Sequence, residues 1–156
     1  MLTNCKVSIV LATVMLSLSQ TIRADDCQLP VLLHQHRNVA TIDALELEWS
    51  RAYLQGDTRL VACLLTADFT EIMRDGEVKH LSDELALAAK NTANPLPIEG
   101  IPKGTVLLHG NVAVAYGRSQ SAAGARAIRY ADYYVWENGQ WRAYFAQQTE
   151  IVASHS

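Results

Sequence analysis

The residue best suited to chemistry lies in an aromatic stretch near the C-terminus. Asp132 stands in the segment 130–136, among three tyrosines and a tryptophan. A carboxyl group enclosed by aromatic rings loses its hydration, which raises its pKa and suits it to act as a general acid or base. Asp132 could instead orient the polar end of a ligand, or hold the pocket floor by bonding tyrosine hydroxyls or Arg118. The sequence leaves these three roles open.

A tight turn predicts which side chains share a face with Asp132. Asn138-Gly139 is typical of a two-residue hairpin loop, so residues 137 and 140 are expected to face each other. Cross-strand partners share a face of the sheet. The predicted face carries Tyr130, Asp132, Tyr134, Trp136, Trp141, Ala143, Phe145 and Gln147. Because this face holds two tryptophans and only one charge, we expect it to pack against helices.

The elements that position this face follow from the periodicity of apolar residues. Helical spacing over residues 39–55 predicts a long helix that ends at Gly56, and Asp57 is expected to begin a second, short helix through residue 65. A hairpin over 68–80 and a third helix over 82–90 follow. Strands are predicted at 105–109, 111–121, 127–136 and 141–151. The sequence therefore predicts an α+β fold.

Other elements carry further side chains that would line any space enclosed beneath this face. The first helix and first strand contribute Trp49, Tyr53 and Phe69. The strand over 111–121 turns inward either a larger or a smaller set of side chains, and the larger is favoured. The larger set is Val114, Tyr116 and Arg118, and the smaller is Ala113, Ala115 and Gly117. Glu71 is expected to face solvent or a subunit interface.

Several short segments carry a resemblance to a known superfamily. They are Gln55-Gly56-Asp57, Ala67-Asp68-Phe69, Arg129-Tyr130-Ala131-Asp132 and Asn138-Gly139-Gln140-Trp141-Arg142. With the order of elements, they resemble the nuclear-transport-factor-2-like (NTF2-like) superfamily over about residues 39–152. More narrowly, they are similar to the domain-of-unknown-function 4440 family, near the SnoaL-like and ketosteroid-isomerase-like groups. The resemblance implies a cone-shaped, curved antiparallel or mixed sheet wrapped around three helices, with an apolar pocket and a homodimer.

This resemblance does not assign a reaction. The superfamily includes isomerases, dehydratases, cyclases, epoxide hydrolases and non-catalytic association domains. Where ketosteroid isomerases carry a tyrosine donor and a catalytic aspartate, this chain has Trp49 and Met73, so that chemistry is not expected. We expect the domain to bind a small, mostly apolar molecule without a cofactor or metal. The alternatives are a cofactor-independent isomerase, lyase or hydrolase that uses Asp132, and a non-catalytic dimerisation or accessory module.

The opposite face of the last hairpin predicts a protein partner. Tyr133, Val135 and Tyr144 lie there together. Three large side chains in one place form a larger exposed apolar patch than the single apolar residues that are normal on a protein surface. A symmetric homodimer through this face is the favoured interpretation, and a monomer whose tyrosines lie among arginines is the alternative. A net charge of −3 argues against nucleic-acid binding, which requires clustered basic residues.

The N-terminus predicts export. Lys6, an apolar run over 7–18 and the small residue Ala24 have the order of a secretory signal peptide over residues 1–24. The run is too short to span a bilayer, although a retained anchor is the alternative. A lead over 25–38, the domain over 39–152 and a tail over 153–156 would follow. The mature protein is thus expected to be secreted or periplasmic, with no membrane contact.

Two cysteines remain after the predicted cleavage. Cys27 and Cys63 would then share an oxidising compartment, where a disulfide between them is one interpretation. Two separate thiols, with Cys63 a small buried apolar residue, are the other.

Overall fold

The computed structural model describes residues 27, 29–98, 101, 103–119 and 127–152. The predicted signal peptide and C-terminal tail lie outside these residues. In the part of the chain that is described, no helix is long and apolar enough to cross a membrane.

The helical segments in the described part of the chain include η2 (Pro30–Leu32), α1 (Val39–Gln55), α2 (Thr58–Leu64) and α3 (Leu81–Ala89). Helices α1 and α2 begin at capping side chains. Gly56 ends α1 in the left-handed conformation at φ 71°, which favours glycine. The side chain of Asp57 then accepts a hydrogen bond of 2.9 Å from the Leu60 N–H and begins α2. The short Gly56-Asp57 link therefore turns the chain sharply between the two helices.

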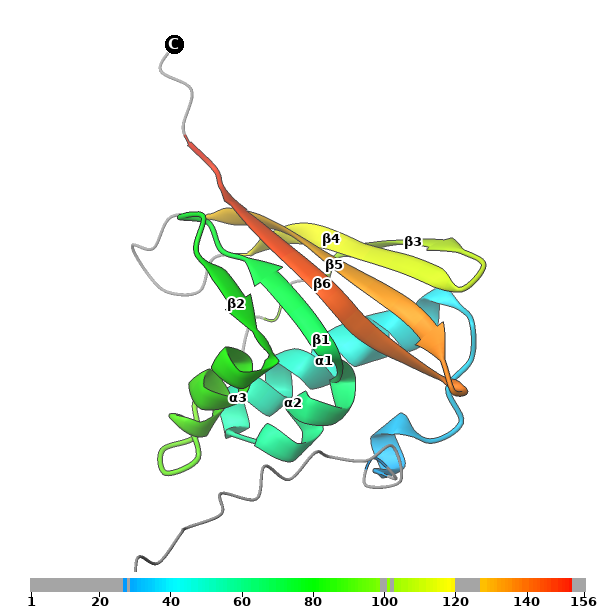
Figure 1. Ribbon diagram of the computed structural model, residues 1–156, viewed down its shortest axis with the longest axis horizontal. Helices are drawn as coiled ribbons and strands as arrows, with labels where there is room; N and C mark the ends of the chain where they lie inside the picture. Colours follow the sequence, from blue (N-terminus) through cyan, green and yellow to red (C-terminus); the bar gives the residue numbers. More distant parts are fainter. Residues whose placement is uncertain (1–26, 28, 99–100, 102, 120–126, 153–156) are drawn as a thin grey trace, which may run out of the picture.

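Six strands in the described part of the chain form one mixed sheet with the order β2-β1-β6-β5-β4-β3. They are β1 (Leu65–Ile72), β2 (Val78–His80), β3 (Thr105–His109), β4 (Val112–Ser119), β5 (Ile128–Glu137) and β6 (Gln140–Glu150). Neighbouring strands are antiparallel except β1 and β6, which are parallel. All three α-helices lie on one face of the sheet (Figure 1). The predicted α+β fold is confirmed.

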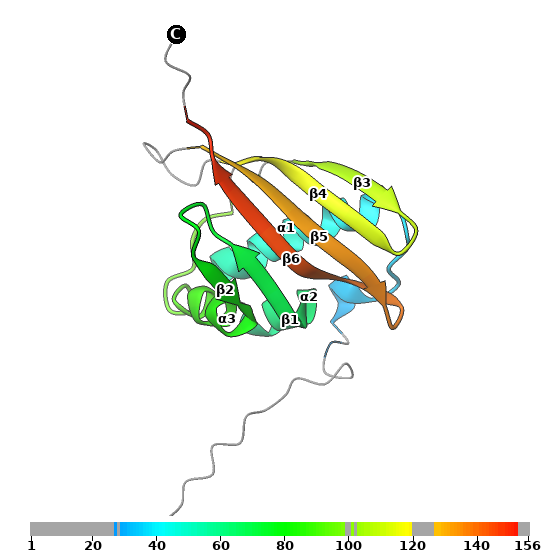
Figure 2. The ribbon, with the colours of Figure 1, turned by 45° about the horizontal axis from the view of Figure 1, so that its top comes forward.

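The two faces of the sheet have different surroundings. On the helix side, the core contains the fully buried side chains of Trp141, Tyr134, Phe69, Leu45 and Ile42. None of the described helices lies over the opposite face of β3 to β6 (Figure 2). The burial of these large apolar side chains between the sheet and the helices stabilises the two-layer arrangement.

A β-bulge changes the predicted pairing of β5 and β6. Near the Asn138-Gly139 turn the register is as predicted, with Trp136 opposite Trp141. Past Tyr144 it shifts by one residue, so Asp132 pairs with Ala146. A one-residue shift moves side chains to the other face. The prediction that Phe145 and Gln147 share the face of Asp132 is therefore wrong.

The inward face of β4 carries the smaller set of side chains. Ala115 pairs with Asp132 and Gly117 with Tyr130, so the expected inward placement of Tyr116 and Arg118 is wrong. The reason is space: a Cβ atom on Gly117 would lie 2.8 Å from the Tyr130 hydroxyl oxygen. Small residues on β4 thus leave room for the large side chains of β5.

The two tryptophans of the last hairpin hold the N-terminal lead to the sheet. Their rings meet edge to face with centroids 5.3 Å apart. The Trp141 Nε1–H donates a 3.0 Å hydrogen bond to the carbonyl oxygen of His36, and the Arg37 guanidinium lies over the Trp136 ring. This pair therefore anchors the lead instead of bordering a pocket.

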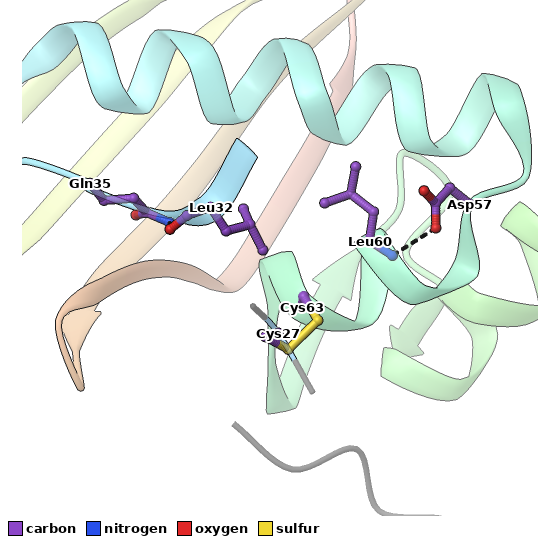
Figure 3. Close-up of a disulfide and its surroundings, with 6 residues drawn as sticks. All are labelled: Cys27, Leu32, Gln35, Asp57, Leu60 and Cys63. Atoms are coloured by element: carbon purple, nitrogen blue, oxygen red, sulfur yellow. Dashed lines mark hydrogen bonds between the residues drawn. A yellow bond between two sulfur atoms is a disulfide. The ribbon is translucent and has the colours of Figure 1, made fainter. Parts of the chain in front are cut away.

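A disulfide makes a second connection to the lead. Cys27 and Cys63 are bonded, with their Cα atoms 5.4 Å apart, and both are buried (Figure 3). Leu32 of η2 is buried nearby. The segment before α1 is thus covalently joined to α2.

Candidate functional site

A cavity of about 710 Å³ lies between the helices and the inner face of the sheet. Its size falls in the usual range for small-molecule sites. Four of the predicted pocket residues border it, namely Trp49, Tyr53, Tyr130 and Asp132. The aromatic side chains and neighbouring aliphatic groups such as Val106 make much of the wall apolar.

Acidic side chains from four elements converge on this cavity. Asp43 and Glu46 come from α1, Glu71 from β1, Glu84 from α3 and Asp132 from β5. Of the described residues that border the cavity, Lys103 is the only one with a cationic side chain. Its Nζ lies 3.1 Å from Asp43 Oδ2, and its side chain is largely exposed. The remaining four carboxyl groups therefore determine the electrostatics of the interior.

Glu46 and Asp132 form an interacting pair. The Tyr134 hydroxyl donates a 2.5 Å hydrogen bond to Glu46 Oε1. Burial raises the pKa of Glu46 to about 7, although hydrogen bonds from Tyr134 and Asp132 oppose the rise. Burial also raises the pKa of Asp132 well above its usual range, and the Glu46 charge raises it further. The Glu46 charge therefore favours the protonated state of Asp132, and the hydrogen bond from Asp132 favours the ionised state of Glu46.

Glu71 and Glu84 extend the acidic lining with different surroundings. Glu71 Oε1 accepts a 2.6 Å hydrogen bond from Gln148 Nε2. Burial raises the pKa of Glu71 despite that bond. Burial raises the pKa of Glu84 to about 7. Only 2% of the surface of this residue is exposed. No described residue hydrogen-bonds Glu84 Oε1, a costly state for a buried oxygen.

Other predicted pocket residues lie outside the cavity lining. Phe69 is fully buried behind Trp49, with ring centroids 5.7 Å apart. Tyr134 is also fully buried, and its hydroxyl group donates a hydrogen bond to Glu46, which borders the cavity. Four others do not border it, because they lie on the outer face of the sheet. These are Tyr116, Arg118, Phe145 and Gln147.

The sequence contained signals for two of the carboxylates that we did not predict. Glu46 lies three residues before Trp49 on α1, so helical geometry turns both the same way. Glu71 follows Phe69 by two residues on β1 and therefore shares its face. The expectation that Glu71 faces solvent or an interface is wrong, since it is 8% exposed. Glu84 resembled an ordinary acid in the first turn of a helix.

The cavity also shows what stands at the positions compared with ketosteroid isomerases. Trp49 and Met73 both border it, so neither a tyrosine donor nor an aspartate stands at these two positions of the lining. In the described part of the chain, no group of three His, Cys, Asp or Glu residues is placed to hold a metal ion.

Solved structures share this architecture. An NTF2-like protein from Cytophaga hutchinsonii is 14% identical, with a TM-score of 0.56, and the match covers 73% of this chain and 99% of that one. A DUF3225-family protein of unknown function from Pectobacterium atrosepticum is 17% identical, with a TM-score of 0.57 and coverage of 80% and 98%. A putative Ca/calmodulin-dependent kinase II association domain from Exiguobacterium sibiricum is 20% identical, with a TM-score of 0.55 and coverage of 77% and 99%.

These likenesses establish an NTF2-like, cystatin-like fold for the chain. No family model matches the sequence, and no curated protein matches it. The narrower resemblance to the domain-of-unknown-function 4440 family stays a prediction.

Proposed function

We propose that this domain binds a small molecule in the cavity between α1, α3 and the inner sheet face. The observation that carries the proposal is a cavity of about 710 Å³ with aromatic walls and a few converging polar groups. Large apolar surface with few oriented polar groups is the usual composition of a ligand site. A packed core would leave no space of this size, which disfavours a purely accessory role.

Filling the cavity is expected to abolish ligand retention. Ser50 is a half-buried cavity residue on α1, so Ser50→Trp would place an indole in the space. Native mass spectrometry of the wild type is expected to show added mass that leaves on denaturation, and Ser50→Trp to lose at least about 90% of it. Ser82→Trp, at an exposed position of α3 away from the lining, is the control. Equal added mass on both variants would contradict the proposal.

The proposal also includes export and a homodimer through the outer sheet face. The N-terminal pattern and the Cys27–Cys63 disulfide support export, because disulfides persist in oxidising compartments. Tyr144 is 38% exposed, and its ring meets Tyr133 on a face that also exposes Leu107 and Val112. The same native spectra test both points. A monomer mass, or a chain that still carries residues 1–24, would contradict them.

A second candidate function is acid–base catalysis by the Glu46–Asp132 pair. The specific observation is that the two carboxyl groups interact inside a largely apolar cavity, with Tyr134 hydrogen-bonded to Glu46. One group could take a proton from a bound substrate while its neighbour returns one. This arrangement suits a cofactor-independent isomerase, lyase or hydrolase.

Asp132→Asn is expected to remove such catalysis while keeping the fold. In D₂O, the wild type should accelerate exchange of the α-protons of an apolar ketone such as cyclohexanone, measured by NMR. The variant should lose about 10²- to 10⁴-fold of that acceleration, because an amide cannot accept the proton. Asp68→Asn, at an exposed position of β1, should keep the full rate. Equal exchange by wild type and Asp132→Asn would count against Asp132 as the acid or base.

A further inference from the structure

The acidic groups of the cavity are more numerous than a neutral ligand needs. Glu46, Glu71, Glu84 and Asp132 all border it, and none of them is within ion-pair distance of a described lysine or arginine. The only cationic side chain in the described lining, that of Lys103, lies against Asp43. Four ionised carboxyl groups in a partly desolvated space are unfavourable unless they take up protons or a positive charge enters the cavity.

Glu84 is the group that points most directly to a missing partner. The residue is 2% exposed, it borders the cavity, and its Oε1 has no hydrogen-bond partner among the described residues. Buried oxygens in native proteins nearly always have a partner, so an unpartnered one at a cavity wall is explained by a ligand donor. Two donors of the same lining, Trp49 Nε1 and the Tyr53 hydroxyl, also lack a partner among the described residues, so a ligand with an acceptor beside its ammonium group would satisfy all three atoms. An ammonium group supplies N–H donors and the opposite charge at once.

The aromatic walls fit the same kind of ligand. Trp49, Tyr53 and Tyr130 border the cavity. The faces of such rings attract organic cations as well as apolar groups, and desolvation strengthens the attraction. A divalent metal ion is a poorer occupant, because the described residues hold no cluster with metal-binding geometry.

We propose that the cavity selects an organic cation, with an apolar body between the aromatic walls and a protonated amine facing Glu84. This inference rests on the proposed ligand-binding function and names the chemical class of the ligand. An organic anion of the same shape would meet the carboxyl groups and be rejected.

Three probes of similar shape and different charge test the proposal. They are 2-phenylethylamine, 2-phenylethanol and 3-phenylpropionate, each titrated at pH 8 and followed by the NMR signal of the Trp49 indole N–H. The amine should bind at least about tenfold more tightly than the alcohol, and the carboxylate most weakly. Glu84→Gln should reduce amine affinity about tenfold and leave alcohol affinity within about twofold. Glu137→Gln, at the exposed end of β5, should change neither.

The amine should also bind more weakly in acid. The cavity lining around Glu84 carries other titratable groups, namely Asp43, Glu46, Tyr53, Glu71, Lys103, Tyr130 and Asp132. The positive charge of Lys79 also lowers the pKa of Glu71. The pKa of Glu84 is about 7, so its ionised fraction falls about tenfold between pH 8 and pH 6. Amine affinity should fall by a similar factor, while alcohol affinity stays level. Glu46, whose pKa is also about 7, adds to this fall of amine affinity with decreasing pH.

The outcomes separate the two proposals. If the alcohol or carboxylate binds and the amine binds no better, the cavity is a ligand site but the cation inference is overturned. If none of the probes binds at about 10 mM, the cation inference is overturned, and the native mass spectra of the wild type and Ser50→Trp decide the ligand-binding function separately. An unchanged amine-to-alcohol ratio in Glu84→Gln overturns the role of Glu84. Glu71→Gln provides a second carboxylate variant should Glu84→Gln not fold.

Discussion

Replacing Cys27 and Cys63 with alanine is expected to lower the free energy of unfolding by about 4 kcal/mol. The disulfide closes a loop with a sequence separation of 36, and loops of that length restrict the unfolded chain by about this amount. Because domains are stable by only about 5–15 kcal/mol, the loss would be a large share of the total. A chain kept in a reducing compartment would suffer the same loss.

The lead would then depend on its noncovalent contacts with the sheet. Gln35 Oε1 accepts a 2.8 Å hydrogen bond from the Trp141 N–H, and the carbonyl oxygen of His36 accepts one from the indole. These bonds contribute about 1 kcal/mol each, which does not replace the disulfide. Urea unfolding with and without a reductant measures the effect, and the double variant should not respond to the reductant. A wild-type midpoint that is the same in both conditions would refute the prediction.

Glu84→Gln is expected to stabilise the protein at pH 8 and to leave its stability unchanged near pH 4. In the folded state the pKa of Glu84 is about 7, against an ordinary value of 4.5. Between these values the folded chain keeps a proton that the unfolded chain releases, so stability falls as pH rises through the window. Below this pH window Glu84 is protonated in both the folded and the unfolded chain. Above it Glu84 is ionised in both, and the whole free-energy cost of burying the charged carboxylate lowers the stability of the fold.

The expected gain at pH 8 is about 1–3 kcal/mol, reduced from the full pKa difference because the carboxyl group faces a cavity that admits solvent. Thermal unfolding between pH 4 and pH 8 measures it, with Glu137→Gln as an exposed control. Glu46, with a pKa also near 7, should preserve part of the wild-type slope in the variant. A gain of equal size at both ends of the pH range would show that packing, and not ionisation, is the cause. This cost of an ionised Glu84 is what a bound cation would offset.

The sequence by itself determined the elements that depend on local chemistry. Helix α1 begins and ends at the predicted residues, because Asn38 caps its start and Gly56 takes a left-handed conformation at its end. The Asn138-Gly139 turn forms as predicted, with φ of 49° and 81°, and it aligns the first pairs of β5 and β6. Local patterning, combined with the pocket that the superfamily resemblance implies, also predicted that Trp49, Tyr53, Tyr130 and Asp132 lie around one space.

Tertiary structure alone decided which partners surround Asp132. The bulge at Tyr144 brings Gln148, instead of Gln147, to the inner face, because one extra residue in a strand exchanges its faces. The inward face of β4 depends on the space that Tyr130 occupies, and no property of β4 itself reveals that. The carboxyl groups come from helices and strands far apart in the chain. Whether each is solvated or desolvated depends on what packs around it, and that environment sets the pKa values of the site.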